Sequence, residues 1–132
     1  MVDPAAGRRR GGDPVTRGAT ADQGRLDDIL DKLRDIREHL RVDRGVFERD
    51  RDLQKIVAYD LMIIGEAASK VSKRTQKANP KVPWTELVEY RNDLIHEYGS
   101  LDLKDTWEFV QRDLREVERR LARVRIARDD VE

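Results

Sequence analysis

Residues 53–71, LQKIVAYDLMIIGEAASKV, carry the clearest folding signal in the chain. Their apolar side chains recur at spacings of three and four, which is the pattern of an α-helix with one buried face. We therefore predict a helix over about residues 50–77, ending before the stop signal Asn79–Pro80. The apolar face of this helix is Leu53, Ile56, Val57, Leu61, Ile64, Ala68 and Val71.

The segments on the N-terminal side give one more helix. An apolar stripe from Leu26 to Leu40 predicts a helix over about residues 25–41. The polar stretch that follows contains Gly45 and suits a connection in which Phe47 packs inward.

Two further helices are predicted on the C-terminal side. Pro83 can occupy the first turn of a third helix, and Gly99 is placed to cap its C-terminus. Asp102 and Asp105 then resemble an N-cap and its partner at the start of a fourth helix. Its apolar seam keeps a 3-4-3-4-3 spacing through Trp107, Val110, Leu114, Val117, Leu121 and Val124.

These patterns predict an all-α fold, an antiparallel four-helix bundle with short loops. The seam of the fourth helix extends beyond what one small bundle covers, so a homodimer is expected to bury the surplus. Residues 1–24 hold five glycines and two prolines without apolar periodicity, and we predict a disordered leader there. The folded domain is expected over residues 25–128.

Composition excludes several classes of function. The chain of 132 residues has no cysteine, which rules out disulfides, thiolate metal sites and cysteine nucleophiles. Its formal net charge is zero, so any basic surface must be local. It contains no apolar run long enough to span a membrane and no secretory signal, so a cytoplasmic protein is expected.

Residues 91–98, RNDLIHEY, hold the best candidate for chemistry. Histidine exchanges protons near neutral pH, and arginine offers a planar, permanently charged fork to phosphate oxygens. Arg91 and His96 together suffice for RNA cleavage without a metal, in which the 2′-OH attacks its own phosphodiester and Arg91 stabilises the charge that develops. One histidine is one short of a separate acid and base, and a two-fold dimer would supply the second.

A structural interpretation of the same residues stays open. Arg91 can pair with a carboxylate such as Glu66 or Asp60, while His96 only caps the helix. The same spacing occurs again at Arg34 and His39, within an ordinary polar helix face, and there we predict a solvent-exposed histidine.

The chain resembles the HEPN-domain toxins of the HepT type. The resemblance rests on RNDLIHEYGSLD, preceded by IGEAASKVSK and VPW and followed by DTWEFVQRDL, and it covers about residues 25–120. It implies a helical bundle that forms a homodimer, in which the R-x4-H motifs of both chains act as a metal-independent ribonuclease. Arg91 and His96 correspond to the catalytic pair, and no cofactor is expected.

The resemblance also implies a partner. In such pairs an MNT-type nucleotidyltransferase antitoxin transfers AMP to a tyrosine of the toxin, which here corresponds to Tyr98. Added phosphates beside His96 would repel RNA. Asn92 is the polar residue that follows the arginine in the family, and Asp93 places a carboxylate beside Arg91 where it can orient or pair with the guanidinium.

The basic residues between Glu66 and Glu86 agree with an RNA substrate. If this stretch also flanks the cleft, we predict phosphate contacts without base specificity, at Lys70, Lys73, Arg74 and Lys77. The alternative is that these cations complement the dipole at the end of the second helix. The alternative function is a non-catalytic helical partner protein, or an accessory subunit of a nucleotidyltransferase, in which Arg91 and His96 are structural.

Overall fold

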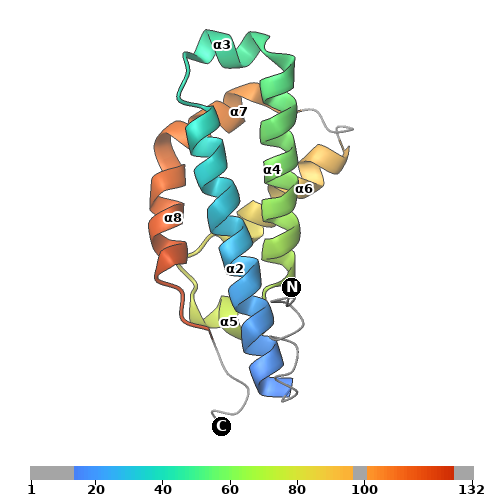
Figure 1. The fold of residues 1–132 in the computed structure, drawn as a ribbon, viewed down its shortest axis with the longest axis vertical. Coiled ribbons are helices and arrows are strands. Elements are labelled where there is room, and N and C mark those ends of the chain that lie inside the picture. The colour runs from blue at the N-terminus through green and yellow to red at the C-terminus, as the bar shows by residue number, and fades with distance from the viewer. Residues whose placement is uncertain (1–13, 97–100, 127–132) are drawn as a thin grey trace, which may run out of the picture.

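The computed structural model describes residues 14–96 and 101–126, and all regular structure within these ranges is helical. The principal helices are α2 (Pro14–His39), α4 (Arg51–Lys70), α6 (Trp84–His96) and α8 (Leu114–Ala122). In Figure 1, α2 lies between α4 and α8, and α6 crosses α4 obliquely. α4 packs against both α2 and α6, and α2 also contacts α8. The predicted all-α class is confirmed for the described part of the chain.

One hydrophobic core joins these helices. Phe47, on the short helix α3 (Arg44–Arg49), is fully buried as predicted and stacks on Trp107 with ring centroids 5.9 Å apart. The other large side chains with almost no exposed surface are Ile29, Leu33, Ile36, Val57, Leu61, Ile64, Leu87, Leu114 and Leu121.

None of the helices in the described ranges combines the length and apolarity needed to cross a membrane.

The N-terminal helix begins earlier than predicted. Residues 14–24, expected in the disordered leader, form the first turns of α2, while residues 1–13 lie outside the described ranges. The physical reason is Asp22, which is buried and accepts hydrogen bonds from the Ser72 backbone N–H (2.9 Å), the Ser72 hydroxyl (2.7 Å) and the Thr75 hydroxyl (2.6 Å). A buried carboxylate satisfied in this way anchors the helix to the body of the protein.

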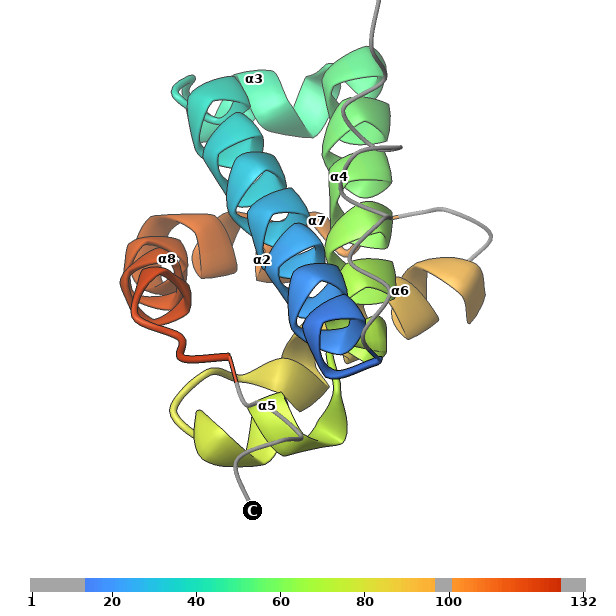
Figure 2. The same ribbon diagram turned by 60° about the horizontal axis from the view of Figure 1, so that its bottom comes forward.

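The same contact divides the long helix predicted over residues 50–77. α4 ends at Lys70, Val71 adopts an extended conformation, and α5 (Lys73–Ala78) begins at the N-cap Ser72. The Ser72 hydroxyl accepts from the Thr75 N–H and donates to Asp22, so it caps α5 and ties it to α2. Figure 2 shows α5 turned across the end of the α2–α4 pair. The stop at Asn79 is as predicted.

The C-terminal helices start where predicted but are less regular. α6 follows Pro83 directly, and Asp102 caps α7 (Leu103–Glu108) by accepting a hydrogen bond from Asp105 N–H at 2.9 Å. A π-helical turn, η1 (Phe109–Asp113), then separates α7 from α8. The predicted fourth helix is therefore one bent, interrupted path.

The apolar seam of that path is covered within the chain. Leu114, Val117 and Leu121 are buried, and an ion pair of 3.2 Å between Arg37 of α2 and Glu118 holds α8 against α2. The expectation that this seam leaves a surplus for a dimer is wrong, because α2 already packs on it.

Candidate active site

α6 presents one face to the core and a different face to solvent. Trp84, Leu87 and Leu94 are buried, and Arg91 on the same helical face is partly buried. Ile95, next to the buried Leu94, is 57% exposed. Arg91 therefore lies at the border between the packed and the exposed surface of α6.

Gly65 of α4 determines how closely α6 approaches at this border. A Cβ atom added to Gly65 would overlap Arg91 Cβ and would lie 3.0 Å from Leu87 O and 3.3 Å from Arg91 N. No side chain larger than hydrogen fits between the helices here. The glycine thus costs some helix propensity but allows the Arg91 backbone to lie directly against α4.

The Arg91 guanidinium is held by three side chains. Its Nη1 donates to Glu66 Oε2 at 2.8 Å and to Ser69 Oγ at 3.3 Å, both on α4. Its Nε and Nη2 donate to Asn92 Oδ1 at 3.3 and 3.1 Å. The arginine side chain is 21% exposed, whereas Glu66 is half exposed. Arg91 consequently has one defined orientation, with its charge partner open to solvent.

The structure distinguishes between the two carboxylates considered as partners of Arg91. Glu66 pairs with Arg91 and with Lys70, whose Nζ lies 3.1 Å away, and hydrogen bonds first from Lys70 and then from Arg91 lower the pKa of Glu66. Asp60 instead lies 3.8 Å from Lys32, and burial raises its pKa. Glu66 is thus ionised at neutral pH and pairs with two cations at once, which leaves this cluster with a net positive charge.

Arg91 and Glu66 line an open groove of about 460 Å³, which we call the Arg91 groove. Arg25 and Asp28 of α2 and Lys70 of α4 add further charges to its wall, and the buried Arg25 Nε has no hydrogen-bond partner among the described residues. The rest of its lining is apolar: Met62, Ile63, Ala67 and Ile95. Cations beside an apolar wall can bind a phosphate and the base or sugar attached to it.

The two residues that follow Arg91 have different roles. Asn92, the polar residue after the arginine, accepts hydrogen bonds from the guanidinium and orients it. Asp93 has no hydrogen bond or ion pair with Arg91 in the described ranges. Instead it lines a separate hollow of about 380 Å³ together with Tyr90, Asp102 and Asp105. The expectation that Asp93 orients or pairs with Arg91 is wrong, because its side chain points to the other side of α6.

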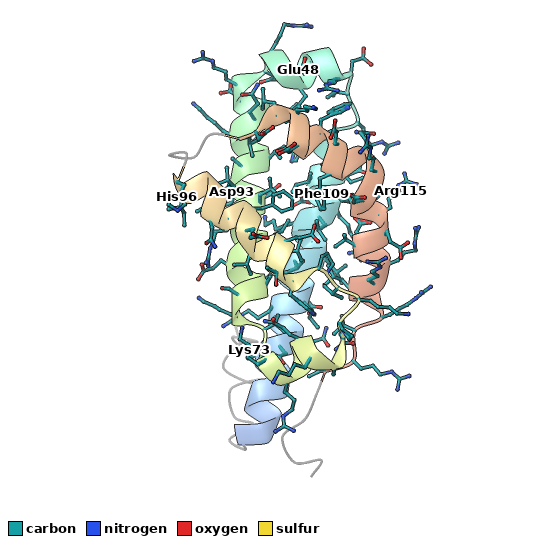
Figure 3. All side chains as sticks on the ribbon, turned by 180° about the vertical axis from the view of Figure 1, so that it is seen from behind. Glu48, Lys73, Asp93, His96, Phe109 and Arg115 are labelled. Atoms are coloured by element: carbon teal, nitrogen blue, oxygen red, sulfur yellow. The ribbon has the colours of Figure 1, made fainter. Side chains whose placement is uncertain are left out.

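His96 is the last residue of α6 and is exposed. Figure 3 shows it at the free end of the helix, at the edge of the molecule. Within residues 14–96 and 101–126 it has no hydrogen-bond or ion-pair partner. Tyr98, the predicted AMP acceptor, and Gly99, the predicted helix cap, lie outside the described residues.

Only one of the four predicted RNA-binding cations lines the Arg91 groove. Lys70 does so, at the end of α4. Lys73, Arg74 and Lys77 are exposed on α5, and Figure 3 places Lys73 well apart from His96 along the molecule. His39 is exposed at the end of α2, as predicted, and Arg34 pairs with Asp31 at 3.7 Å.

Several groove residues were not predicted from sequence as part of the site. Arg25 and Asp28 come from α2, about 65 positions before Arg91, and no local signal connects them to it. Gly65 did carry a signal, because a glycine in the middle of an apolar helix indicates close approach of another backbone.

Comparisons with known proteins agree with the resemblance seen in the sequence. The family model described as "Ribonuclease HepT-like" matches residues 29–124. A Methanocaldococcus jannaschii protein named "Putative RNase MJ1380" is 33% identical over 95 residues, which cover 71% of this chain and 87% of that protein. A Thermococcus cleftensis protein named "Probable ribonuclease HepT" is 32% identical over 90 residues, or 67% and 82% of the two chains. No solved structure gave a significant match.

The close approach at Gly65 leads to a stability prediction. Gly65→Ala should lower the free energy of unfolding by roughly 1–3 kcal/mol, because the added methyl group must push α6 away from α4. Gly24→Ala is the matched control, since a Cβ there meets nothing within 4 Å and alanine favours a helix by about 0.5–1 kcal/mol. Urea unfolding of both variants measures the difference. Equal midpoints for the two variants would contradict the proposed contact.

Proposed function

This chain belongs to the HepT-like ribonuclease family, and on that premise we propose that it is a metal-independent endoribonuclease that acts as a homodimer. We further propose that it is the toxin of a toxin–antitoxin pair and that AMP transfer to Tyr98 silences it. The observation that carries the proposal is the orientation of Arg91, whose guanidinium is fixed at the wall of an open groove by a solvent-exposed carboxylate.

The chemistry follows from the two side chains on α6. The 2′-oxygen of a ribose attacks the adjacent phosphorus, and the bond from phosphorus to the 5′-oxygen breaks, which leaves a 2′,3′-cyclic phosphate and a 5′-hydroxyl. One imidazole accepts the 2′-OH proton and another donates a proton to the leaving 5′-oxygen. Arg91 stabilises the negative charge on the equatorial oxygens of the phosphorane.

Glu66 has a definite part in this reaction. Glu66 is open to solvent, and ion pairs exposed in this way are screened by water and contribute little to stability. A phosphate can therefore replace Glu66 as the partner of Arg91 at small cost. Until RNA binds, Glu66 and Ser69 hold the guanidinium in the groove.

A second copy of the chain is required because each protomer offers one suitable histidine. The surface next to the Arg91 groove favours such an association: Ile56, Tyr59 and Ile95 are 43%, 64% and 57% exposed. Ile56, Tyr59 and Ile63 follow one face of α4 at spacings of four or three, and Ile63 and Ile95 also line the groove. A partner that covers this apolar stripe would lie beside Arg91.

Silencing by the nucleotidyltransferase rests on the position of Tyr98, two residues after His96. The tyrosine hydroxyl would attack the α-phosphorus of ATP and release pyrophosphate. The phosphate that it gains carries negative charge beside the proton-transfer group, where it repels the RNA backbone.

The Arg91–Glu66 pair also favours the second candidate function, a non-catalytic helical partner or accessory subunit of a nucleotidyltransferase. In that case the ion pair only links α4 to α6. The parent protein would then have no nuclease activity to lose, and the variants below would change only its stability.

The first test is RNA cleavage by the purified protein in the presence of a metal chelator. Arg91→Ala and His96→Ala should each lower the cleavage rate by about 100-fold or more, because positioned acid–base groups contribute ~10²–10⁴-fold. The matched control is the double variant Arg34→Ala with His39→Ala, which removes the other arginine–histidine pair at the same spacing. It should cleave RNA at the parental rate. Cleavage by His96→Ala at the parental rate would exclude the proposed role.

The second test concerns the dimer. Ile56→Glu with Tyr59→Glu should shift the protein to a monomer in sedimentation velocity and abolish cleavage, because four like charges would face each other across the two-fold axis. Val46→Glu, at a 38% exposed apolar residue on α3, should leave the dimer intact. A fully active monomer would refute the requirement for two chains.

The third test addresses Tyr98. Intact-mass measurement after co-expression with the nucleotidyltransferase should show one or more AMP groups on the parent and none on Tyr98→Phe. The modified parent should cleave RNA at least about tenfold more slowly, since the added charge weakens phosphate binding. Unmodified protein after co-expression, or AMP on Tyr98→Phe, would remove this part of the proposal.

A further inference from the structure

A second groove, of about 600 Å³, lies between the C-terminal end of α2 and the path from α7 through η1 to α8. We call it the arginine groove. In Figure 3, Arg115 lies on one side of the molecule and His96 on the other, so this groove is separate from the candidate active site. The cations that line it are Arg37, Arg41, Arg112, Arg115 and Arg119.

The charges of the arginine groove are only partly neutralised. Its lining carboxylate, Glu116, already pairs with Arg119 at 2.6 Å and with Arg120 at 3.2 Å. Arg112 and Arg115 are exposed and have no ion pair or hydrogen bond within the described ranges. The groove therefore presents two guanidinium groups with unused hydrogen-bond donors, which is the arrangement that binds phosphate oxygens.

The floor of the arginine groove is apolar. It is formed by Leu40, Val42, Trp107 and Val110. Trp107 is partly exposed, and its ring is kept in place by stacking on Phe47 at an interplanar angle of 26°. An aromatic ring held rigidly beside arginines is suited to stack a base while the arginines bind the flanking phosphates.

The backbone of the groove wall is also irregular. Arg112 lies in the π-helical turn η1, between Trp107 on α7 and Arg115 on α8. π-helical turns inside α-helices are rare and are frequent at functional sites. Here the turn shapes the segment that carries the unpaired arginines.

We propose that the arginine groove binds a single-stranded segment of RNA at a distance from the cleavage point. The choice of RNA rests on the proposed function, but the groove itself is independent of Arg91 and His96. RNA fits better than an acidic protein segment because every cation in the lining is arginine and a tryptophan lies among them.

Binding of a fluorescein-labelled single-stranded RNA to full-length protein, measured by anisotropy over a range of salt concentrations, tests this proposal. The labelled strand carries 2′-O-methyl groups, which block attack by the 2′-oxygen, so it stays intact during the measurement whichever residues catalyse cleavage. The double variant Arg112→Glu with Arg115→Glu should weaken RNA binding about tenfold or more. It should also reduce the slope of the logarithm of the association constant against the logarithm of the salt concentration by about 1.4, because it removes two phosphate contacts and each contact to a single strand contributes ~0.7. Arg49→Glu with Arg51→Glu, two exposed arginines beside α3, is the control of equal charge and should change binding less than threefold.

The outcomes separate the two proposals. If the groove variant binds RNA like the control variant, the groove does not bind RNA, and its charge then fits an acidic protein segment. If the groove variant loses binding while Arg91→Ala and His96→Ala cut like the parent, the groove proposal survives and the proposed catalytic pair fails. Circular dichroism melts of both double variants confirm that each is folded.

Discussion

The close packing of α4 against α6 at Gly65 is the constraint on which the candidate site depends. Because Gly65 has no side chain, the Arg91 backbone lies against α4, and its guanidinium reaches Glu66, the next residue of α4, and Ser69, one turn further on. Asn92 closes the arrangement from the other side. Any side chain at position 65 would move α6 outward and take Arg91 away from these partners. Backbone proximity thus brings the guanidinium within hydrogen-bond distance of the side chains that orient it.

The two ends of α6 have different physical characters. Its middle is packed against α4 and keeps Arg91 in one place, whereas His96 lies at the exposed end. This difference suits a site in which the charge-stabilising group must be fixed and the proton-transfer group must meet a second chain. The exposed apolar stripe of α4 beside the groove gives such a chain a surface to cover.

Charge is distributed unevenly around α6 and over the rest of the molecule. On one side the Arg91 groove carries three cations, and on the other side Asp93, Asp102 and Asp105 line a hollow that disfavours phosphate. Tyr90 lies in the same hollow, where burial and the neighbouring carboxylates raise its pKa to about 12. The arginine groove lies on the far side of the molecule. A chain whose net charge is zero thereby has two separate grooves lined by cations.

The sequence by itself determined the helical class, the start of α6 at Pro83, the cap at Asp102 and the placement of Arg91 and His96 on one helix, because periodicity and capping are local properties. Tertiary structure decided the rest. Asp22 extends α2 and divides the predicted long helix through partners 50 and 53 residues away, and Glu66 binds Arg91 across 25 residues. The exposure of Ile95, the burial of the α8 seam and the position of Asp93 likewise depend on which helix packs on which face. Contacts between residues so distant in the chain leave no local pattern from which they can be predicted.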